Sequence, residues 1–455
     1  MEKQISHHDL VDSELSISKY FSNKLLLRTA LTHPSFVEQY QRKLSSFEHL
    51  EFLGDAVMQF VVYEHMYHKM NQFKQSGTKY CWDQAAGYLL SNKHLKQVST
   101  DLKLQDYILF GQERGIIMIA KLLGDVFEAL VGAIFLDKGI QGARDFVVEY
   151  CVPRSDEEWI DLLEQNLHAP ERIQSYQFIP PCKLCAADDL MRMEQDIGYV
   201  FEHKHLLQCA MTGHYVNKGV DGTIQGADGN LHCGCNGRLR SLGISILRFV
   251  VTEHLFLSYP SIEEGTLSLS IHMIMDKDDT CMTKGTQLSK VQEYMTISGP
   301  DDPQFPVKRD TCNAMLALFA AAYIDAGGFI TYRSQEPAHT PVPDYLVPYQ
   351  SLRHDVGSKL IDRFVLSIFR HYTRMHPTHV GWPPKHALQH LTQITFHNTK
   401  PSYSSRMNED GTNTVLVHNH EGVLIGKGTS KVYKEAEEIA VRDGITYCEL
   451  FLVQA

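Results

Sequence analysis

Apolar residues recur at the helical period along two segments in the N-terminal part of the chain. With about 3.6 residues per turn, positions three and four apart share one face of a helix. The first segment covers residues 47–58 and the second covers residues 121–130. The apolar positions are Leu50, Phe52, Leu53, Val57 and Met58, then Leu122, Leu123, Val126, Phe127 and Leu130. This pattern predicts two core helices.

The same two helices carry carboxylates at helical spacing. Glu51 lies four residues before Asp55, and Asp125 lies three residues before Glu128. Such pairs are most often solvated or bound in salt bridges, and that interpretation stays open for either pair alone. Buried together, however, four carboxylates repel one another and lose their hydration. Mg²⁺ or Mn²⁺ relieves both costs, so the four acids are predicted metal ligands.

Taken together and in this order, residues 47–55 and 121–130 resemble the two signature motifs of the ribonuclease III family, nearest to its Dicer branch. Residues 30–36 match the opening helix and turn of that family. The resemblance covers about residues 14–152. One departure lies at residues 47–49, where the family usually has an Asn and a basic residue around the first acid.

The resemblance implies a metal-dependent endoribonuclease that cuts double-stranded RNA and leaves 5′ phosphate and 3′ hydroxyl ends. Lys121 precedes Asp125 by one turn, and it is expected either to meet transition-state charge or only to balance the acids. Glu48 is expected to support the ligands from behind. Asn92 resembles a family position near the scissile phosphate.

A degenerate second copy of this pattern follows in the chain. Residues 206–216 echo residues 26–36, residues 236–256 resemble the first signature, and residues 310–325 resemble the second. The apolar positions persist at Leu239, Leu242, Ile246, Phe249 and Val250, then at Met315, Leu318 and Phe319. We therefore expect the helical scaffold to be kept.

The chemistry of the second copy is expected to be lost. Arg240 stands where the first signature has Glu51, and Ile244 stands in place of its second acid. In the second signature we expect Asp310 to be kept and Asn313 to replace the other acid. An arginine among the ligands would repel a divalent cation. One working site predicts a cut in a single strand for each binding event.

Residues 384–455 resemble a double-stranded-RNA-binding domain. A first helix from Pro384 to Gln393 precedes strand-like residues 401–403 and 414–418. Residues 426–431 then lead into a second helix. In the family, lysines at this helix N-terminus grip phosphates, which implies RNA contacts from Lys427, Lys431 and Lys434. The segment holds seven Lys and Arg against eight Asp and Glu, so a protein–protein role is the alternative.

The fold class implied is mainly α, with two all-helical ribonuclease III domains forming an intramolecular pseudo-dimer, plus a small α+β domain of α-β-β-β-α order. The expected boundaries are 14–152 for the catalytic domain, 153–190 for a linker, 191–335 for the degenerate domain, 336–382 for a connecting helical segment and 383–455 for the RNA-binding-like domain.

Four cysteines form a candidate structural zinc site. Cys182 and Cys185 lie in the Pro-flanked linker, and Cys233 and Cys235 end a Gly- and Asp-rich loop at residues 217–235. Four thiolates suit tetrahedral zinc, with His232 as an alternative ligand. The other interpretation is that these are unpaired loop cysteines, because the spacing of the second pair is uncommon in zinc sites.

Composition narrows the functional classes. The 455 residues include ten Cys and show no apolar run long enough for a membrane span and no signal-peptide core, so we expect a reducing compartment, cytoplasm or nucleus. The net charge of −11 opposes generic nucleic-acid binding unless cations or a basic protein partner compensate. A non-catalytic RNA-binding or scaffold protein is the alternative. A ribosome-associated structural protein would be basic.

The role suggested by these observations is RNA processing, such as the small-RNA production of RNA interference. No helicase P-loop and no end-anchoring ruler segment is recognisable in the sequence. A fixed product length therefore does not follow.

Overall fold

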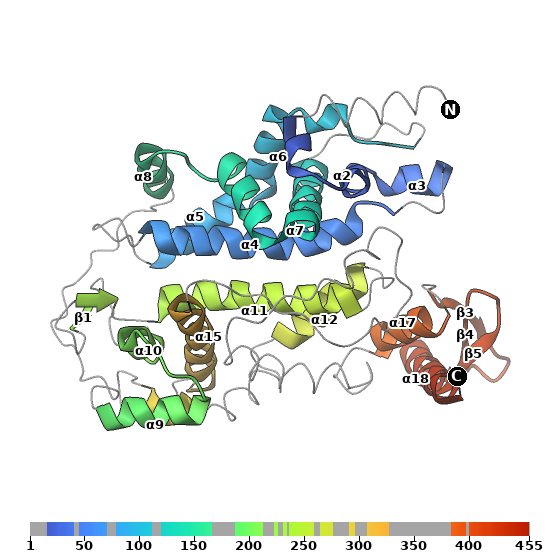
Figure 1. The fold of residues 1–455 in the computed structure, drawn as a ribbon. Coiled ribbons are helices and arrows are strands. Elements are labelled where there is room, and N and C mark those ends of the chain that lie inside the picture. Colours follow the sequence, from blue (N-terminus) through green and yellow to red (C-terminus); the bar gives the residue numbers. More distant parts are fainter. Residues whose placement is uncertain are drawn as a thin grey trace. The chain divides into compact units, whose positions relative to one another are not determined.

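The computed structural model describes residues 16–40, 45–70, 79–111, 120–165, 187–212, 223–225, 231–233, 236–258, 264–275, 291–295, 307–326, 384–396 and 400–454. These residues form two compact units. The first unit holds the described residues up to Glu253 together with 291–295 and 307–326. The second unit holds 254–258, 264–275 and the C-terminal residues from 384 (Figure 1).

The first unit contains two related sets of elements. The first repeat (described residues 16–165) comprises η1 (Ser16–Tyr20), α2 (Lys24–Ala30), α3 (Pro34–Tyr40), α4 (Glu48–Met70), α5 (Lys79–Leu89), α6 (Asn92–Asp101), η2 (Leu104–Asp106), α7 (Ala120–Tyr150) and α8 (Asp156–Gln165). The two predicted core helices are α4 and α7, which pack against each other. All ten apolar residues that predicted them are buried. Gly139, with φ of 71°, divides α7 into two helical parts.

Glycines allow α4 and α7 to touch along their backbones. A Cβ on Gly54 would lie 1.7 Å from the carbonyl oxygen of Glu128, and a Cβ on Gly132 would lie 2.2 Å from the carbonyl oxygen of Leu50. Only residues without a side chain permit this approach. The close crossing brings the acid-bearing turns of the two helices together.

The second repeat (described residues 187–253, 291–295 and 307–326) follows the same plan. Its elements are α9 (Ala187–Ile197), α10 (Lys204–Ala210), β1 (Thr223–Gln225), β2 (Leu231–Cys233), α11 (Gly237–Ser258, which continues beyond this unit), α14 (Val291–Tyr294) and α15 (Val307–Asp325). The apolar positions carried over by the sequence pattern are buried here too. The predicted loop at residues 217–235 instead contains an antiparallel hairpin, with Ile224 opposite His232. Two three-residue strands are too short to show a period-two pattern.

Hydrogen bonds at matching positions confirm the repeat. The Asp137 carboxylate accepts from the backbone N–H of Asn23 at 3.0 Å, directly before α2. The Asp325 carboxylate accepts from the backbone N–H of His203 at 2.8 Å, directly before α10. Each acid therefore ties its long helix to the start of a shorter one, α2 in the first repeat and α10 in the second.

The helices α4 and α11 also begin alike. The backbone N–H of Phe47 donates to the carbonyl of Thr32 at 2.9 Å, and that of Asn236 donates to the carbonyl of Thr212 at 2.9 Å. The two helices therefore align without a gap from these residues onward, so Arg240 occupies the place of Glu51, as predicted.

The crossing of α11 and α15 fixes the register of the second signature. A Cβ on Gly243 would lie 1.8 Å from the carbonyl oxygen of Leu316, as a Cβ on Gly54 would from that of Glu128. Leu316 therefore occupies the place of Glu128. The matching caps made by Asp137 and Asp325 require the same register.

This register corrects one sequence prediction. Asn313 takes the place of Asp125, and Asp310 lies one helical turn earlier, so Asp310 is not a retained ligand. Arg240 and Ile244 occupy the two acid positions of α11. The second repeat therefore keeps none of the four acids.

Aromatic rings show that the two repeats pair with pseudo-two-fold symmetry. Phe60 and Phe249 hold equivalent positions and stack on each other, with ring centroids 5.2 Å apart. Phe60 also meets Tyr323 edge-on at 5.7 Å, and Phe249 meets the equivalent Phe135 edge-on at 5.4 Å. Each repeat thus offers the same patch to the other, as in an isologous dimer. This confirms the predicted intramolecular pseudo-dimer.

A buried ion pair within the first repeat is contacted from across the same interface. Arg144 donates to Glu64 through Nε and Nη2, at 2.5 and 2.7 Å. The hydroxyl of Tyr323, from the second repeat, lies 3.0 Å from Arg144 Nη2 and also bonds to Glu64. Burial raises the pKa of Tyr323. Its hydroxyl therefore stays neutral and donates to the carboxylate.

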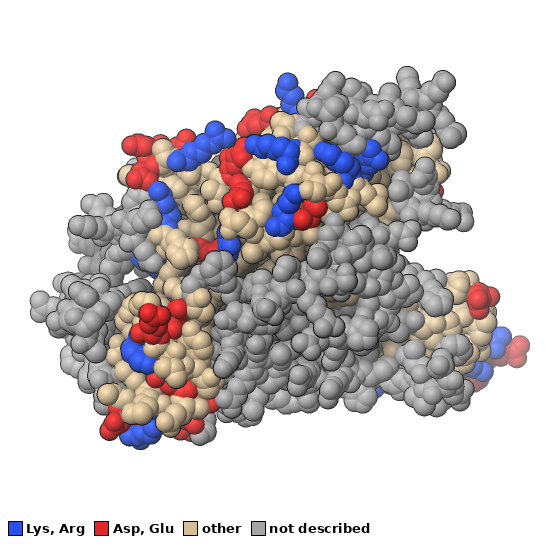
Figure 2. All heavy atoms as spheres, viewed as in Figure 1, with Lys and Arg blue, Asp and Glu red and all other residues tan. Residues whose placement is uncertain are grey.

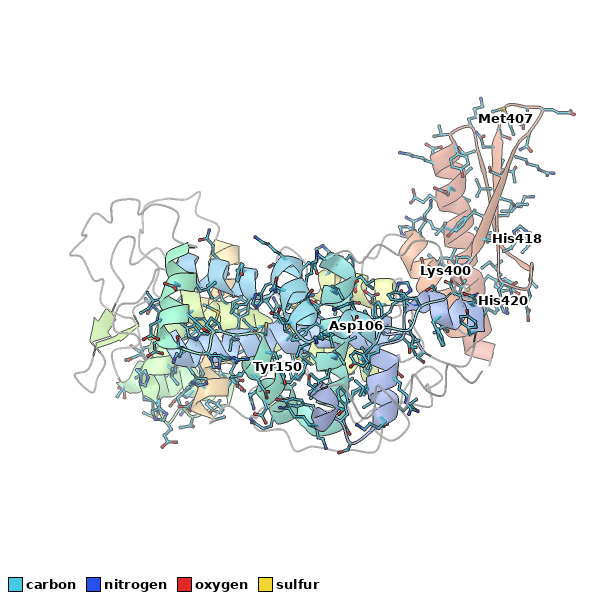
Figure 3. The ribbon with its side chains drawn as sticks, turned by 90° about the horizontal axis from the view of Figure 1, so that it is seen from above. Asp106, Tyr150, Lys400, Met407, His418 and His420 are labelled. Carbon is cyan, nitrogen blue, oxygen red and sulfur yellow. The ribbon has the colours of Figure 1, made fainter. Side chains whose placement is uncertain are left out.

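The second unit contains α12 (Glu264–Met275), α17 (Pro384–Thr395), β3 (Ser402–Met407), β4 (Asn413–His418), β5 (Leu424–Ser430) and α18 (Tyr433–Gln454). The three strands form an antiparallel sheet in the order β3-β4-β5. Buried residues of this core include Leu388, Val415, Val417 and Ala440. Figure 3 shows Lys400 and His418 at one end of the β3–β4 hairpin and Met407 at the other. The predicted α-β-β-β-α order is confirmed.

Some predictions lie outside the described residues. The connecting segment at 336–382 is among them, as is most of the linker at 153–190. The domain boundaries therefore stay predictions. No helix among the described residues is both long and apolar enough to span a membrane.

Candidate active site

Three of the four predicted acids converge at the crossing of α4 and α7. Glu51, Asp125 and Glu128 each offer a carboxylate oxygen, and these oxygens lie within 4.8 Å of one another. All three side chains are half-buried. The acidic cluster, as we call these three residues, has the hard oxygen donors that Mg²⁺ and Mn²⁺ prefer.

The surroundings of Glu128 destabilise the ionised form of its carboxyl group. Burial raises the pKa of Glu128 well above its usual range, and the charges of Asp55, Glu51 and Asp125 raise it further. Lys121 acts in the opposite direction. A bound divalent cation would remove this penalty, so the residues present fit a metal ion.

The fourth acid, Asp55, differs from the expectation that all four carboxylates face one point. Asp55 is not one of the three converging acids. Its Oδ2 instead accepts from Nη2 of Arg248 at 2.5 Å, and each side chain is 36% exposed. Arg248 lies on α11 of the second repeat. Helical spacing brings Asp55 to the correct face, but a cation from the other repeat holds its carboxylate.

Sequence reasoning missed Arg248. The two partners lie 193 residues apart, so no local spacing joins them. The available signal was the repeat itself, because pairing α4 against α11 across a pseudo-two-fold axis places the middle of each helix near the other.

Lys121 pairs with the cluster, as its spacing suggested. Its Nζ donates to both carboxylate oxygens of Asp125, at 3.0 and 2.9 Å, and the side chain is 65% exposed. The hydrogen bond to Asp125 raises the pKa of Lys121. This geometry balances the charge of the acids and leaves the ammonium accessible to a substrate.

Glu48 and Asn92 each begin a helix of the first repeat. Glu48 is exposed at the start of α4 and accepts from the hydroxyl of Ser46 at 3.0 Å. Asn92 begins α6, and its Oδ1 covers Gly124, where a Cβ would lie only 2.5 Å away. Asn92 therefore lies beside the residue that precedes Asp125.

The predicted RNA contacts in the C-terminal unit are exposed. Lys427 lies on β5, Lys431 directly after it, and Lys434 in the first turn of α18. Acidic residues surround them: Glu435 accepts from Ser430 at 2.8 Å, and Asp443 accepts from the backbone N–H of Lys427 at 2.9 Å. The mixed charge matches the sequence census.

The candidate zinc ligands lie mostly beyond the described residues. Cys182, Cys185 and Cys235 belong to segments that the structure does not describe, and Cys233 is described only as part of β2. The zinc site therefore stays a prediction.

Acidic and basic side chains are interspersed over the helices of the first repeat (Figure 2). A family model described as ribonuclease-III-like matches residues 23–155. Ribonuclease 3 of Chloroflexus aggregans is 32% identical over 177 residues, which cover 36% of this chain and 73% of that protein. The chain belongs to the ribonuclease III family.

Two further relatives differ in length. Ribonuclease 3 of Homo sapiens is 27% identical over 287 residues, covering 61% of this chain and 19% of that ribonuclease III protein. Ribonuclease 3 of Borreliella burgdorferi is 37% identical over 142 residues, covering 29% and 54%. The chain thus spans between a fifth and about half of these two proteins.

Two solved structures can also be aligned with the chain. The nuclease domain of ribonuclease III from Campylobacter jejuni is 30% identical and covers 34% of this chain and 96% of that domain, with a TM-score of 0.25. Dicer from Giardia intestinalis is 13% identical and covers 77% and 62%, with a TM-score of 0.47.

Proposed function

We propose that this ribonuclease III family member is a divalent-metal-dependent endoribonuclease that cleaves double-stranded RNA at one site. The observation that carries the proposal is the acidic cluster, in which Glu51, Asp125 and Glu128 converge from two helices in a fold of this family. Repulsion among these acids destabilises the fold, which is expected where the acids bind a metal ion and not where they have only a structural role.

The roles of the side chains follow from their positions. Glu51, Asp125 and Glu128 would hold Mg²⁺ or Mn²⁺, which would supply a nucleophilic hydroxide near neutral pH and stabilise the leaving 3′ oxygen. Lys121, exposed beside Asp125, is placed to meet a non-bridging oxygen of the scissile phosphate. Asn92 lies against Gly124, directly before Asp125. The products would carry 5′ phosphate and 3′ hydroxyl ends.

We propose further that each binding event cuts one strand. The second repeat has Arg240, Ile244, Asn313 and Leu316 at the four ligand positions, so none of these positions offers a carboxylate to a metal ion. A duplex that meets both repeats would therefore meet one working site. Cutting the second strand would require rebinding in the opposite orientation or a second molecule.

A single-turnover assay tests both proposals. Duplex RNA labelled on either strand is mixed with excess protein and Mg²⁺, and the ends are mapped on denaturing and native gels. We expect nicked duplex with 5′ phosphate ends, and no cleavage in EDTA. Simultaneous staggered cuts in both strands would contradict the one-site proposal. Cleavage unaffected by EDTA would contradict the metal proposal.

Lys427, Lys431 and Lys434 are proposed RNA contacts of the C-terminal unit, because they are exposed around the start of α18, where backbone N–H groups favour anions. Replacing Lys431 and Lys434 by Ala should weaken duplex binding and lower the slope of log affinity against log salt by roughly two. Lys385→Ala, on α17, is the matched control. Unchanged affinity and slope would favour a protein–protein role for this unit.

One alternative function is supported by a specific observation. The net charge of −11 suits a scaffold or a protein that needs a basic partner to hold RNA. The EDTA-sensitive assay separates this alternative from an enzyme. RNA processing of the kind used in RNA interference, in the cytoplasm or nucleus, is our proposal for the biological setting.

A further inference from the structure

We propose that Arg248 is a counter-ion through which the degenerate second repeat regulates metal binding by the first. The inference rests on the proposed metal-dependent function and goes beyond it, because it assigns the second repeat a role in the chemistry. Arg248 is a positioning residue in this proposal. It acts on the metal site through Asp55.

Arg248 contacts Asp55 directly. Arg248 Nη2 lies 2.5 Å from Asp55 Oδ2. Arg248 Nε is buried and has no hydrogen-bond partner among the described residues. The carboxylate of Asp55 is therefore the guanidinium's described polar contact, and it also acts electrostatically on Glu128.

The pseudo-two-fold symmetry of the repeats does not reproduce the contact between Arg248 and Asp55. Because α4 and α11 align without a gap, Arg248 matches Gln59 and Asp55 matches Ile244. The symmetry-related contact would join a neutral amide to a hydrocarbon side chain. The arginine belongs to the repeat that lacks the four acids, and the carboxylate belongs to the repeat that has them.

The consequence is competition between two cations. In the metal-free protein, Arg248 lowers the repulsion among Asp55 and the acidic cluster. A divalent ion bound at the cluster lowers the repulsion among the carboxylates more strongly. The positive charge of Arg248 nearby repels that ion. Arg248 therefore stabilises the metal-free state and weakens divalent-ion binding, which sets the ion concentration at which the site fills.

The test is titration calorimetry of the full chain with Mg²⁺, and with Mn²⁺ in parallel. Arg248→Ala should tighten binding by about twofold to fivefold, the range for losing a half-exposed ion pair that opposes the ion. Arg248→Lys keeps the charge and should stay near wild type. The matched control is Arg240→Ala, which removes another α11 cation, paired with Asp83 at 3.8 Å, and should leave the affinity unchanged.

Thermal melts supply a second readout. Arg248→Ala should lower the melting temperature of the metal-free protein and leave that of the Mg²⁺-saturated protein close to wild type. An equal fall in both states, with unchanged affinity, would show a structural role only and overturn the inference. Weaker duplex binding in EDTA with unchanged ion affinity would make Arg248 an RNA contact instead, which also overturns it. If the wild-type chain binds no divalent ion, the proposed function itself fails.

Discussion

At the scale of single residues, Glu128 is where burial and charge meet. It lies at the point where α7 touches the backbone of α4, among three other carboxylates. No single neighbour explains its raised pKa, because burial and three like charges act in the same direction. The pKa of Glu128 therefore depends on all the charged groups of the site.

Replacing Glu128 by Gln should abolish cleavage. The amide keeps the shape but offers a neutral ligand, and we expect the rate to fall by more than about a hundredfold, since even indirect supports of metal ligands cost 10–100-fold. Duplex binding in EDTA should be unchanged. Glu38→Gln, on the exposed end of α3, is the control and should cleave normally. Retained cleavage by Glu128→Gln would refute the site.

Glu128 also predicts a pH dependence. A carboxyl group whose pKa is raised in the folded state binds more protons there than in the unfolded chain. Stability of the metal-free protein should therefore fall as the pH rises from about 4.3, the unfolded value, through the folded pKa. Urea unfolding in EDTA at several pH values measures this. Glu128→Gln should flatten the dependence, and an unchanged profile would contradict the assignment.

Some of these residues could be predicted from the sequence and others could not. Helical spacing identified Glu51, Asp125 and Glu128, because both helices are regular and the partners within each are local. It did not identify Arg248, whose partner is set by how the repeats pair. A contact of that kind follows from packing, which no spacing rule contains.

At the scale of elements, the crossing of α4 and α7 depends on Gly54. Gly54→Ala would force a Cβ into the carbonyl of Glu128, so the helices must separate. We expect a loss of about 1–3 kcal/mol in the free energy of unfolding, together with weaker cleavage. The control is Gly87→Ala on α5, where nothing lies within 4 Å. That change should stabilise the protein by roughly 0.5–1 kcal/mol. Equal effects in urea unfolding would contradict this account.

The register of α15 shows why a motif can be misplaced by one turn. Asp310 and Asn313 have the three-residue spacing of Asp125 and Glu128, so a match on polar residues is satisfied. The rest of α15 is rich in small and apolar residues, so its sequence pattern does not reveal a shift of one helical turn. Packing does not tolerate it, because Gly243 must face the backbone at Leu316.

At the scale of the whole first unit, Tyr323 links the repeats through the Arg144–Glu64 pair. Tyr323→Phe removes a buried donor from a carboxylate and should cost about 1–3 kcal/mol in unfolding free energy. Because the repeats then pair less firmly, cleavage should fall as well. Tyr199→Phe, whose hydroxyl bonds to Asp325 at 3.0 Å within the second repeat, is the control. If both variants lowered cleavage equally, the link would not be specific to the pairing.

The pairing of the repeats was predictable from the sequence in outline, since the apolar positions of both copies were visible. The partners across the interface were not, because aromatic residues at core spacing look alike whether they pack within a repeat or against the other one.

The stack of Phe60 on Phe249 bears on why the repeat without the four acids would persist. Without its counterpart, Phe60 would leave an aromatic surface open to water, which invites aggregation. The second repeat can therefore lose the four acids without exposing its neighbour, provided that it keeps the aromatic rings that cover Phe60.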